Sequence, residues 1–403
     1  MTHRILSVCL VVLAACAPGA EVEELPSPAG EGSGEPYVSS IGDGIVMSWL
    51  QRSDAGGHDM WVAQLTEDGW SPASLVTHGD DLFVNWADFP SVVAGGDGSL
   101  WGHWLQRKPG AGLAYDILVS RSTDGGATWS KPWTPHEDGT PTEHGFVTLF
   151  PTPDGVGMTW LDGRQYAPDA DGNPPTKVMT LRSRWASTAG EPGPEVLVDG
   201  RTCDCCQTDV AVTGAGPVVV YRDRTDDEVR DVYVSRWSGG GWSEGVPVHD
   251  DGWVIGGCPV NGPAVDAREL DVAVAWFTGA GGVPKVLVAF SRDGGITFDS
   301  PVRVDAGDPS GRVDLRLLPG GDAAVSWLER TGGDAAELRL VRVSSDGTVG
   351  PPLLVGSSSS SRASGFPRMT SVPWAPNKLL VAWTDTSEGE HSSVRVAQVE
   401  VGS

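Results

Sequence analysis

The chain has 403 residues and a formal net charge of −25, from 28 basic and 53 acidic residues. This charge repels nucleic acid and anionic membrane surfaces, so neither is expected as a partner. The 54 glycines, 30 prolines and 17 tryptophans, without long amphipathic helical patterns, predict an all-β fold of short strands and turns.

Residues 1–16 predict a lipoprotein signal peptide. Arg4 precedes an apolar run, Ile5 to Ala15, that is too short to span a bilayer and is followed by Cys16. The Leu-Ala-Ala-Cys ending resembles the bacterial lipobox, whose cysteine is lipidated and becomes the first residue after cleavage. An ordinary secretory signal is the alternative. We therefore expect a protein of the bacterial cell envelope, in the outer membrane, periplasm or cell surface, held to the membrane only through this N-terminal lipid.

Residues 17–35 are rich in proline, glycine and glutamate and predict a flexible tether. No later segment is apolar enough to span a membrane. The folded domain is therefore expected at residues 36–403.

Within this domain an apolar strand that ends in tryptophan or tyrosine occurs seven times, with the aromatic residues 51 to 61 positions apart. A repeat of this length with four strand-like runs per unit predicts a β-propeller. Seven four-stranded blades are expected, and six are the alternative if one unit is an elaboration. The last unit ends after its third strand, so the segment Glu21–Leu25 could supply the missing strand and close the ring. The aromatic-ended strands are Ile45–Trp49, Leu100–Trp104, Val156–Trp160, Val218–Tyr221, Val272–Trp276, Ala323–Trp327 and Leu380–Trp383.

Two turns share the pattern Ser-x-Asp-x-Gly-x-Thr-aromatic and follow strand-like runs. This pattern resembles the Asp-box, or bacterial neuraminidase repeat, so the chain resembles propellers of the sialidase superfamily. The resemblance implies that the aspartates are structural and that the turns lie on the face opposite the active site. The residues that carry it are Ser122, Asp124, Gly126 and Trp129 in the first turn and Ser291, Asp293, Gly295 and Phe298 in the second.

The resemblance also implies a function for the loops after the aromatic strands. Sialidases bind a substrate carboxylate through arginines, and convergent guanidinium groups suit such a ligand. The corresponding residues here are the substrate-binding candidates Arg164, Arg222, Arg224 and Arg330 and the catalytic candidates Asp162, Tyr166 and Asp223. The chain departs from the family because it lacks the aromatic-Arg-Ile/Leu-Pro motif and an assignable Tyr–Glu pair. Salt bridges between adjacent loops are the alternative role for these charges.

Four cysteines fall in two neighbouring loops between blades, at Cys203, Cys205, Cys206 and Cys258. Three interpretations are open: two disulfides that join the loops, a copper or zinc site with help from nearby histidines, or a redox-active thiol. The nearby histidines include His136 and His144. Asp169 and Asp171 alternate in a long loop, which suits either calcium or a solvated turn.

Two functions follow. The first is a monomeric, envelope-anchored sialidase-like propeller that binds or hydrolyses a glycan or small acidic ligand, acting as an exo-sialidase-like glycoside hydrolase if it is an enzyme. The second is a non-enzymatic binding or scaffold propeller whose Cys/His face is stapled by disulfides or binds copper or zinc.

Overall fold

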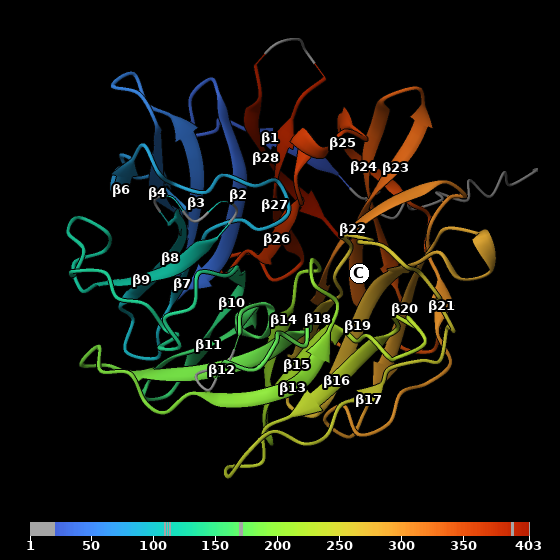
Figure 1. Ribbon diagram of the computed structural model, residues 1–403. Coiled ribbons are helices and arrows are strands. Elements are labelled where there is room, and N and C mark those ends of the chain that lie inside the picture. Colours follow the sequence, from blue (N-terminus) through green and yellow to red (C-terminus); the bar gives the residue numbers. More distant parts are fainter. Residues whose placement is uncertain are drawn as a thin grey trace, which may run out of the picture.

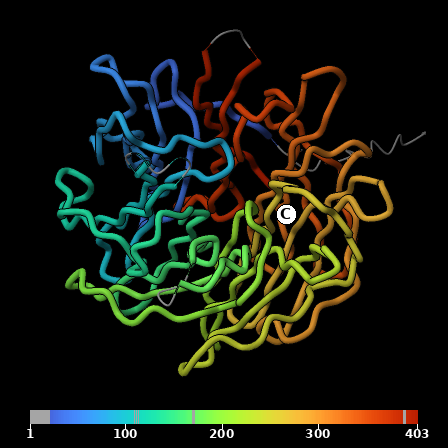
Figure 2. Tube along the Cα trace, viewed as in Figure 1, coloured from blue at the N-terminus to red at the C-terminus, as the bar shows by residue number. Residues whose placement is uncertain are grey.

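The chain forms a ring of antiparallel sheets around a central axis (Figure 1). The structure is a computed structural model, and it describes residues 21–108, 110, 112, 114–168, 172–387 and 391–402. There are seven sheets, so the predicted all-β, seven-bladed β-propeller is confirmed and the six-bladed alternative is wrong. The colours in Figure 2 run once around the ring, which brings the two ends of the chain together. The predicted signal peptide with Cys16 and the calcium candidates Asp169 and Asp171 lie outside the described residues.

Blades 2 to 6 are meanders whose strands follow one another from the axis outward, whereas the outermost strand of blade 7 comes from the start of the chain. Blade 1 contains β2 (Ser33–Ile41), β3 (Gly44–Arg52), β4 (His58–Thr66), β5 (Gly69–Trp70) and β6 (Ser74–Gly79); blade 2 contains β7 (Ser91–Ala94), β8 (Leu100–Arg107) and β9 (Tyr115–Ser122). Blade 3 contains β10 (His144–Thr152), β11 (Gly155–Asp162), β12 (Met179–Ser187) and β13 (Val196–Thr202); blade 4 contains β14 (Asp209–Thr213), β15 (Gly216–Arg222), β16 (Val232–Arg236) and β17 (Val246–Pro247). Blade 5 contains β18 (Ala264–Arg268), β19 (Asp271–Thr278), β20 (Lys285–Ser291) and β21 (Val302–Arg303); blade 6 contains β22 (Pro309–Leu317), β23 (Ala323–Gly332), β24 (Ala335–Val343) and β25 (Leu353–Ser359). Blade 7 contains β26 (Arg368–Ser371), β27 (Lys378–Asp385), β28 (Ser393–Glu400) and β1 (Val22–Leu25). Three short 3₁₀ helices complete the described elements: η1 (Arg164–Tyr166), η2 (Ala280–Gly282) and η3 (Arg362–Ser364).

The first strand of the chain closes the ring. β1 pairs antiparallel with β28, from Val22 opposite Val399 to Leu25 opposite Val396. The expected tether over 17–35 is therefore wrong from residue 22 onward, because β1 and the beginning of β2 fall inside it. The physical reason is that an unpaired β28 would leave an open sheet edge, which this segment covers.

The aromatic residues of the repeat form the core between blades. All seven lie on the second strand of their blade, and none is more than 4% exposed. Each blade is covered on both faces by its neighbours, so its central strands are buried on both sides and read as continuous apolar runs. Three of these indole N–H groups find acceptors two residues along the same strand face, as in Trp160 Nε1 to Asp162 at 3.0 Å and Trp49 Nε1 to Gln51 at 3.3 Å. The indoles of Trp276 and Trp383 donate instead to Asp251 and to the carbonyl of Ser357.

Aspartates on the inner strands link blades 4, 5, 6 and 7 in succession. A carboxylate oxygen of Asp209 accepts the backbone N–H of Val265 at 2.9 Å, and Asp266 accepts that of Leu317 at 2.8 Å. Asp314 continues the series to blade 7. Because buried carboxylates require such donors, these contacts both satisfy the acids and hold the ring together.

The two Asp-box-like turns have the same hydrogen bonds. Ser122 Oγ donates to Asp124 at 2.8 Å, and Thr128 N and Oγ1 both donate to Asp124. Ser291 and Asp293 repeat this arrangement with a bond of 2.8 Å. Each turn follows the third strand of its blade. Since antiparallel strands alternate in direction, these turns lie on one face, called the back face here, and the loops between blades and after second strands lie on the opposite front face.

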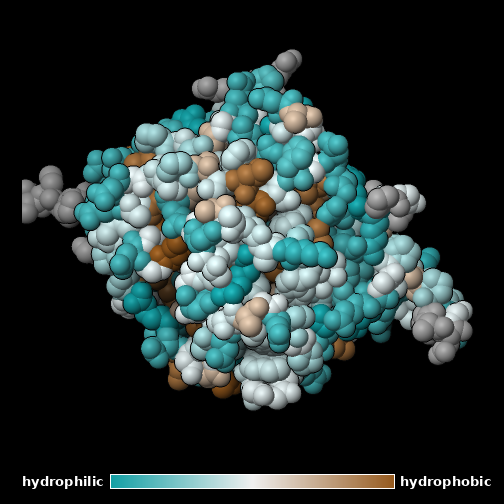
Figure 3. Space-filling view, turned by 90° about the vertical axis from the view of Figure 1, so that its left-hand side faces the viewer, coloured by the Kyte–Doolittle hydropathy of each residue, from teal (hydrophilic) through white to brown (hydrophobic). Residues whose placement is uncertain are grey.

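The side of the ring shown in Figure 3 is mostly hydrophilic, with separate apolar patches rather than one continuous apolar surface. In the described part of the chain, no helix is long and apolar enough to cross a membrane.

Candidate functional site

A pocket on the front face brings together loops of blades 2, 3 and 4. Its volume is about 350 Å³, and we call it the front pocket. It is lined by Ala114, Pro141, Thr142, Glu143, Gly163, Tyr166, Met179 and Asp204.

Tyr166 and Asp204 are the polar centre of the front pocket. The 3₁₀ helix η1 leaves the Tyr166 side chain 40% exposed, and its hydroxyl donates to Asp204 Oδ1 at 2.6 Å. Burial, and then the hydrogen bond to this carboxylate, raise the pKa of Tyr166 to about 12. The phenol therefore stays protonated at neutral pH, and Tyr166 lines the pocket.

Glu143 adds a second carboxylate to the same wall. Burial raises its pKa, and the negative charge of Asp204 raises it further. An aromatic face beside two carboxylates suits a ligand with apolar ring faces and hydroxyl donors.

The front end of the central axis is closed by side chains. Gln207 spans it, donating to the carbonyl of Ala87 and accepting the backbone N–H of Gly262 at 3.0 Å. Trp86 stacks on Phe366 with ring centroids 5.9 Å apart. The front pocket is therefore an off-axis site.

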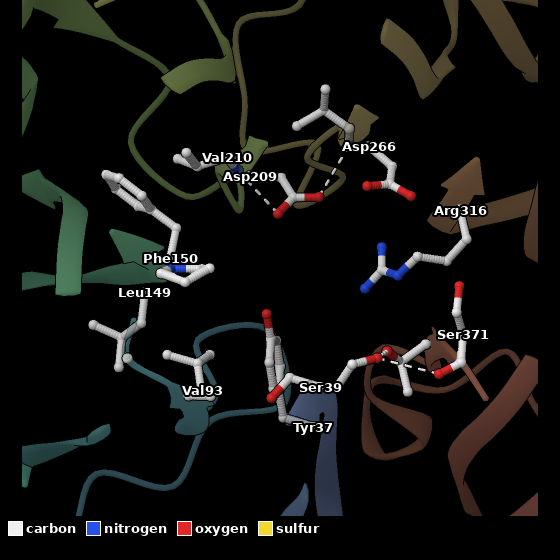
Figure 4. A pocket seen from close by; sticks show the side chains of 16 residues that line it. Tyr37, Ser39, Val93, Leu149, Phe150, Asp209, Val210, Asp266, Arg316 and Ser371 are labelled. Carbon is white, nitrogen blue, oxygen red and sulfur yellow. Dashed lines mark hydrogen bonds between the residues drawn. The ribbon is translucent and has the colours of Figure 1, made fainter. Parts of the chain in front are cut away.

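A separate axial cavity of about 320 Å³ lies between the inner strands of all seven blades. Figure 4 shows Tyr37, Asp209, Asp266 and Arg316 pointing into it. Burial raises the pKa of Asp209 to about 6, although Arg368 and Arg316 act against this. Because Asp209 and Asp266 already accept backbone N–H groups of the next blade, the polar lining of this cavity serves the ring itself.

The catalytic candidate Asp162 lies outside the front pocket lining and is completely buried at the end of β11. It accepts bonds from Trp160 Nε1 and from Arg164 Nε and Nη2, the latter two at 2.7 Å. Burial alone would raise the pKa of Asp162, but the Arg164 hydrogen bonds lower it. Its position supports a structural ion pair.

Asp223, the other acidic candidate, follows β15 and is also absent from the front pocket lining. Burial, followed by the charge of Asp199, raises its pKa to about 7. Tyr221, on the same strand end, donates to Asp199 at 2.6 Å. Of the three catalytic candidates, the structure places only Tyr166 in the pocket.

The four candidate arginines do not present a common set of free guanidinium groups. Arg164 binds Asp162 and Glu195, Arg224 binds Glu228 and Asp204, and Arg330 lies 3.3 Å from Asp308. The expectation of an arginine-rich binding face is therefore not supported by their contacts.

Arg222 is the clearest departure, because it is only 1% exposed. Its guanidinium donates to the carbonyl oxygens of Arg230, Asn261 and Phe277 at 2.6 to 3.1 Å. It also stacks over Trp253 at 4.9 Å. These contacts occupy the planar fork of donors that would have held a carboxylate.

His136 and His144 form a buried stacked pair, with ring centroids 3.8 Å apart and planes at 5°. Asp116 lies 3.3 Å from His136 Nε2 on one side, and Asp138 lies 3.1 Å from His144 Nε2 on the other. Burial lowers the pKa of His136. Asp116 with the two histidines, and Asp138 with His144 and Asp162, form two groups whose ligand atoms lie within 4.8 Å of one another and could hold a metal ion.

All four described cysteines are free thiols, so the predicted pair of disulfides is not present. Cys203, Cys205 and Cys206 share one loop, with their sulfur atoms within 4.8 Å of one another. Cys258, from the next loop between blades, lies beside Cys205 but outside this group of three. Hydrogen bonds from its neighbours lower the pKa of the Cys203 thiol. These thiols gather in one place, whereas two disulfides would hold them in two separate pairs.

Sequence reasoning missed Glu143 and Asp204 as pocket residues. Asp204 lies inside the Cys-Asp-Cys-Cys run, and Glu143 directly precedes His144 at the start of β10. Both positions were visible as acids in loops between blades, but only the folded ring shows that they share a pocket.

No family model and no curated protein matches the chain. Several solved structures share its fold. The BP39L lectin from Burkholderia pseudomallei is 15% identical, with a TM-score of 0.60 over 93% of this chain and 98% of that one. The α-L-arabinanase of Penicillium chrysogenum is 12% identical, with a TM-score of 0.51 over 96% and 99%. The phage phi92 endosialidase is 8% identical, with a TM-score of 0.51 over 95% and 69%. The chain therefore has a β-propeller fold like that of glycan-binding and glycan-processing proteins.

Proposed function

We propose that this protein binds glycans in the front pocket. The observation that carries the proposal is the half-exposed ring of Tyr166 beside the carboxylates of Asp204 and Glu143 in a pocket of about 350 Å³. This volume is within the range of small-ligand sites, and a sugar can stack on the tyrosine while its hydroxyls donate to the acids. The glycan-related propellers with the same fold support a ligand of this class.

The pocket favours neutral or amino sugars over sialic acids. The nearest arginine, Arg224, is already paired with Asp204 at 2.9 Å and with Glu228 at 2.8 Å. A sugar carboxylate entering the pocket would meet two carboxylates and no free guanidinium among the described lining residues. An ammonium or hydroxyl group of a sugar would instead meet carboxylates that can accept its hydrogen bonds.

A glycan array probed with the labelled protein tests the proposal. We expect binding to neutral or amino sugars, reduced at least tenfold by Tyr166→Ala, because the mutation removes both the stacking surface and the phenol. Ile296→Ala is the control, since this residue lies within the second back-face turn and is 58% exposed. Binding confined to sialosides, or unchanged by Tyr166→Ala, would refute the assignment.

Turnover is tested separately with fluorogenic glycosides. Product release by the protein, and its loss in Asp204→Asn, would make the pocket an enzyme site. Binding without release would make it a lectin-like site.

We also propose that the protein is anchored in the bacterial envelope through lipid on Cys16, as the leader pattern indicates. Metabolic labelling with radioactive palmitate should label the protein, and Cys16→Ala should abolish both the label and the membrane association. Equal labelling of both proteins would refute this.

A further inference from the structure

Cysteines from two different loops lie close together on the front face. Cys203, Cys205 and Cys206 lie between β13 and β14, and Cys258 lies between β17 and β18. Cys203 Sγ and Cys206 Sγ are 3.2 Å apart, and the Cys205 sulfur completes a group within 4.8 Å. Cys258 lies beside Cys205 but outside this group of three, so the fold places a fourth thiol next to the cluster that the Cys-Asp-Cys-Cys run forms.

Sulfur is the donor that this cluster offers. The neighbouring carboxylate of Asp204 is already used by Tyr166 at 2.6 Å and by Arg224 at 2.9 Å. Hard cations such as calcium and magnesium prefer oxygen ligands, whereas thiolates select Zn²⁺, Cu⁺ and iron–sulfur clusters. Of these, Zn²⁺ and Cu⁺ bind as single ions.

The surrounding charge suits an occupied thiolate site. The Arg230 side chain is 4% exposed, and its Nη1 donates to Cys203 Sγ at 3.4 Å. Four thiolates around one Zn²⁺ carry a net charge of −2, and three thiolates around one Cu⁺ carry the same charge. The buried Arg230 guanidinium offsets part of that charge, and its Nη2 also pairs with Glu228 at 2.7 Å.

We propose that Cys203, Cys205, Cys206 and Cys258 form a binding site for a soft metal ion, Zn²⁺ or Cu⁺. A tetrahedral zinc site with Zn–S bonds near 2.3 Å places its sulfurs about 3.8 Å apart. The three clustered sulfurs lie within 4.8 Å of one another, so only small side-chain rotations separate the structure from that arrangement. Cys258 is exposed and Cys205 partly so, which gives an ion a path from solvent. The proposal is independent of glycan binding.

Metal titration of the reduced, metal-free protein under anaerobic conditions tests this site. We expect one Zn²⁺ per chain with loss of free thiols in a dithionitrobenzoate assay. In a separate titration, Cu⁺ is supplied from a chelator of known affinity. Metal analysis of protein isolated from metal-replete cells identifies the native ion, and Co²⁺ substitution should give thiolate charge-transfer bands.

Cys258→Ser is the decisive variant, because its exposed side chain contributes little to packing. It should weaken metal binding at least tenfold while the thermal unfolding midpoint of the metal-free protein stays unchanged. Asp250→Asn is the matched control, an exposed acid in the same loop. The proposal is overturned if neither ion binds stoichiometrically. Equal binding by Cys258→Ser and the unmodified protein, or isolation of the protein with these cysteines in disulfides, also overturns it.

Discussion

Replacing the buried Arg222 with methionine should destabilise the protein by about 3 kcal/mol. Its guanidinium is the charged donor to three backbone carbonyls, those of Arg230, Asn261 and Phe277. Hydrogen bonds to charged groups contribute about 1.5–3 kcal/mol each, and relief of the buried charge returns part of this sum. Urea unfolding followed by tryptophan fluorescence measures the difference. Arg222→Lys should lose about 1–2 kcal/mol, because an ammonium keeps the charge but lacks the planar fork.

Arg330→Met is the control, because the Arg330 side chain is 43% exposed and has one weak ion pair at 3.3 Å. A surface change of this kind should stay within about 0.5 kcal/mol of the unmodified protein. The reasoning fails if Arg222→Met is as stable as the unmodified protein. If that equally stable variant has also lost glycan binding, Arg222 contacts the ligand instead of holding the loops.

Three further outcomes test the fold. Asp124→Ala should lower the urea midpoint of unfolding, because Thr128 loses both of its acceptors, and it should leave glycan binding unchanged; lost binding would contradict the back-face assignment. Asp88 accepts the Tyr115 hydroxyl at 2.8 Å, and burial raises its pKa from 3.8 to about 7, so the folded protein holds a proton that the unfolded chain releases. The contribution of Asp88 to the free energy of unfolding therefore falls by up to about 4 kcal/mol between pH 4 and pH 7, and Asp88→Asn should flatten that part of the stability–pH profile; an unchanged slope would refute the raised pKa. Deleting Val22–Leu25 should expose the edge of β28, lower the unfolding midpoint and promote concentration-dependent association in sedimentation experiments; a stable monomer would show that this strand is dispensable.

The sequence alone was enough to predict the propeller and its number of blades. Trp160 and its six counterparts recur at nearly constant spacing because each blade must bury the same strand face against its neighbour. The closing strand near Val22 also followed from counting, since the last unit lacked one strand. The two turns at Asp124 and Asp293 oriented the ring, because their position after third strands determines which loops lie on the front face.

The partners of the charged side chains were decided only in three dimensions. In the sequence, Arg222 and Asp162 were predicted to belong to a ligand site. In the structure, Arg222 donates to backbone carbonyls such as that of Arg230, and Asp162 pairs with Arg164. Sequence shows which charges lie near one another along the chain, whereas desolvation and pairing depend on what the neighbouring blade presents. A buried charge takes whichever partner the fold provides.

The same reason explains the front face. The sequence by itself determined that cysteines, histidines and acids would gather in the loops there. Only the tertiary structure decided that Cys258 meets Cys205, that His136 stacks on His144, and that Asp204 turns toward Tyr166. The repeat sets the ring because its period is local to each blade, but contacts between loops of different blades depend on distances that no local pattern contains.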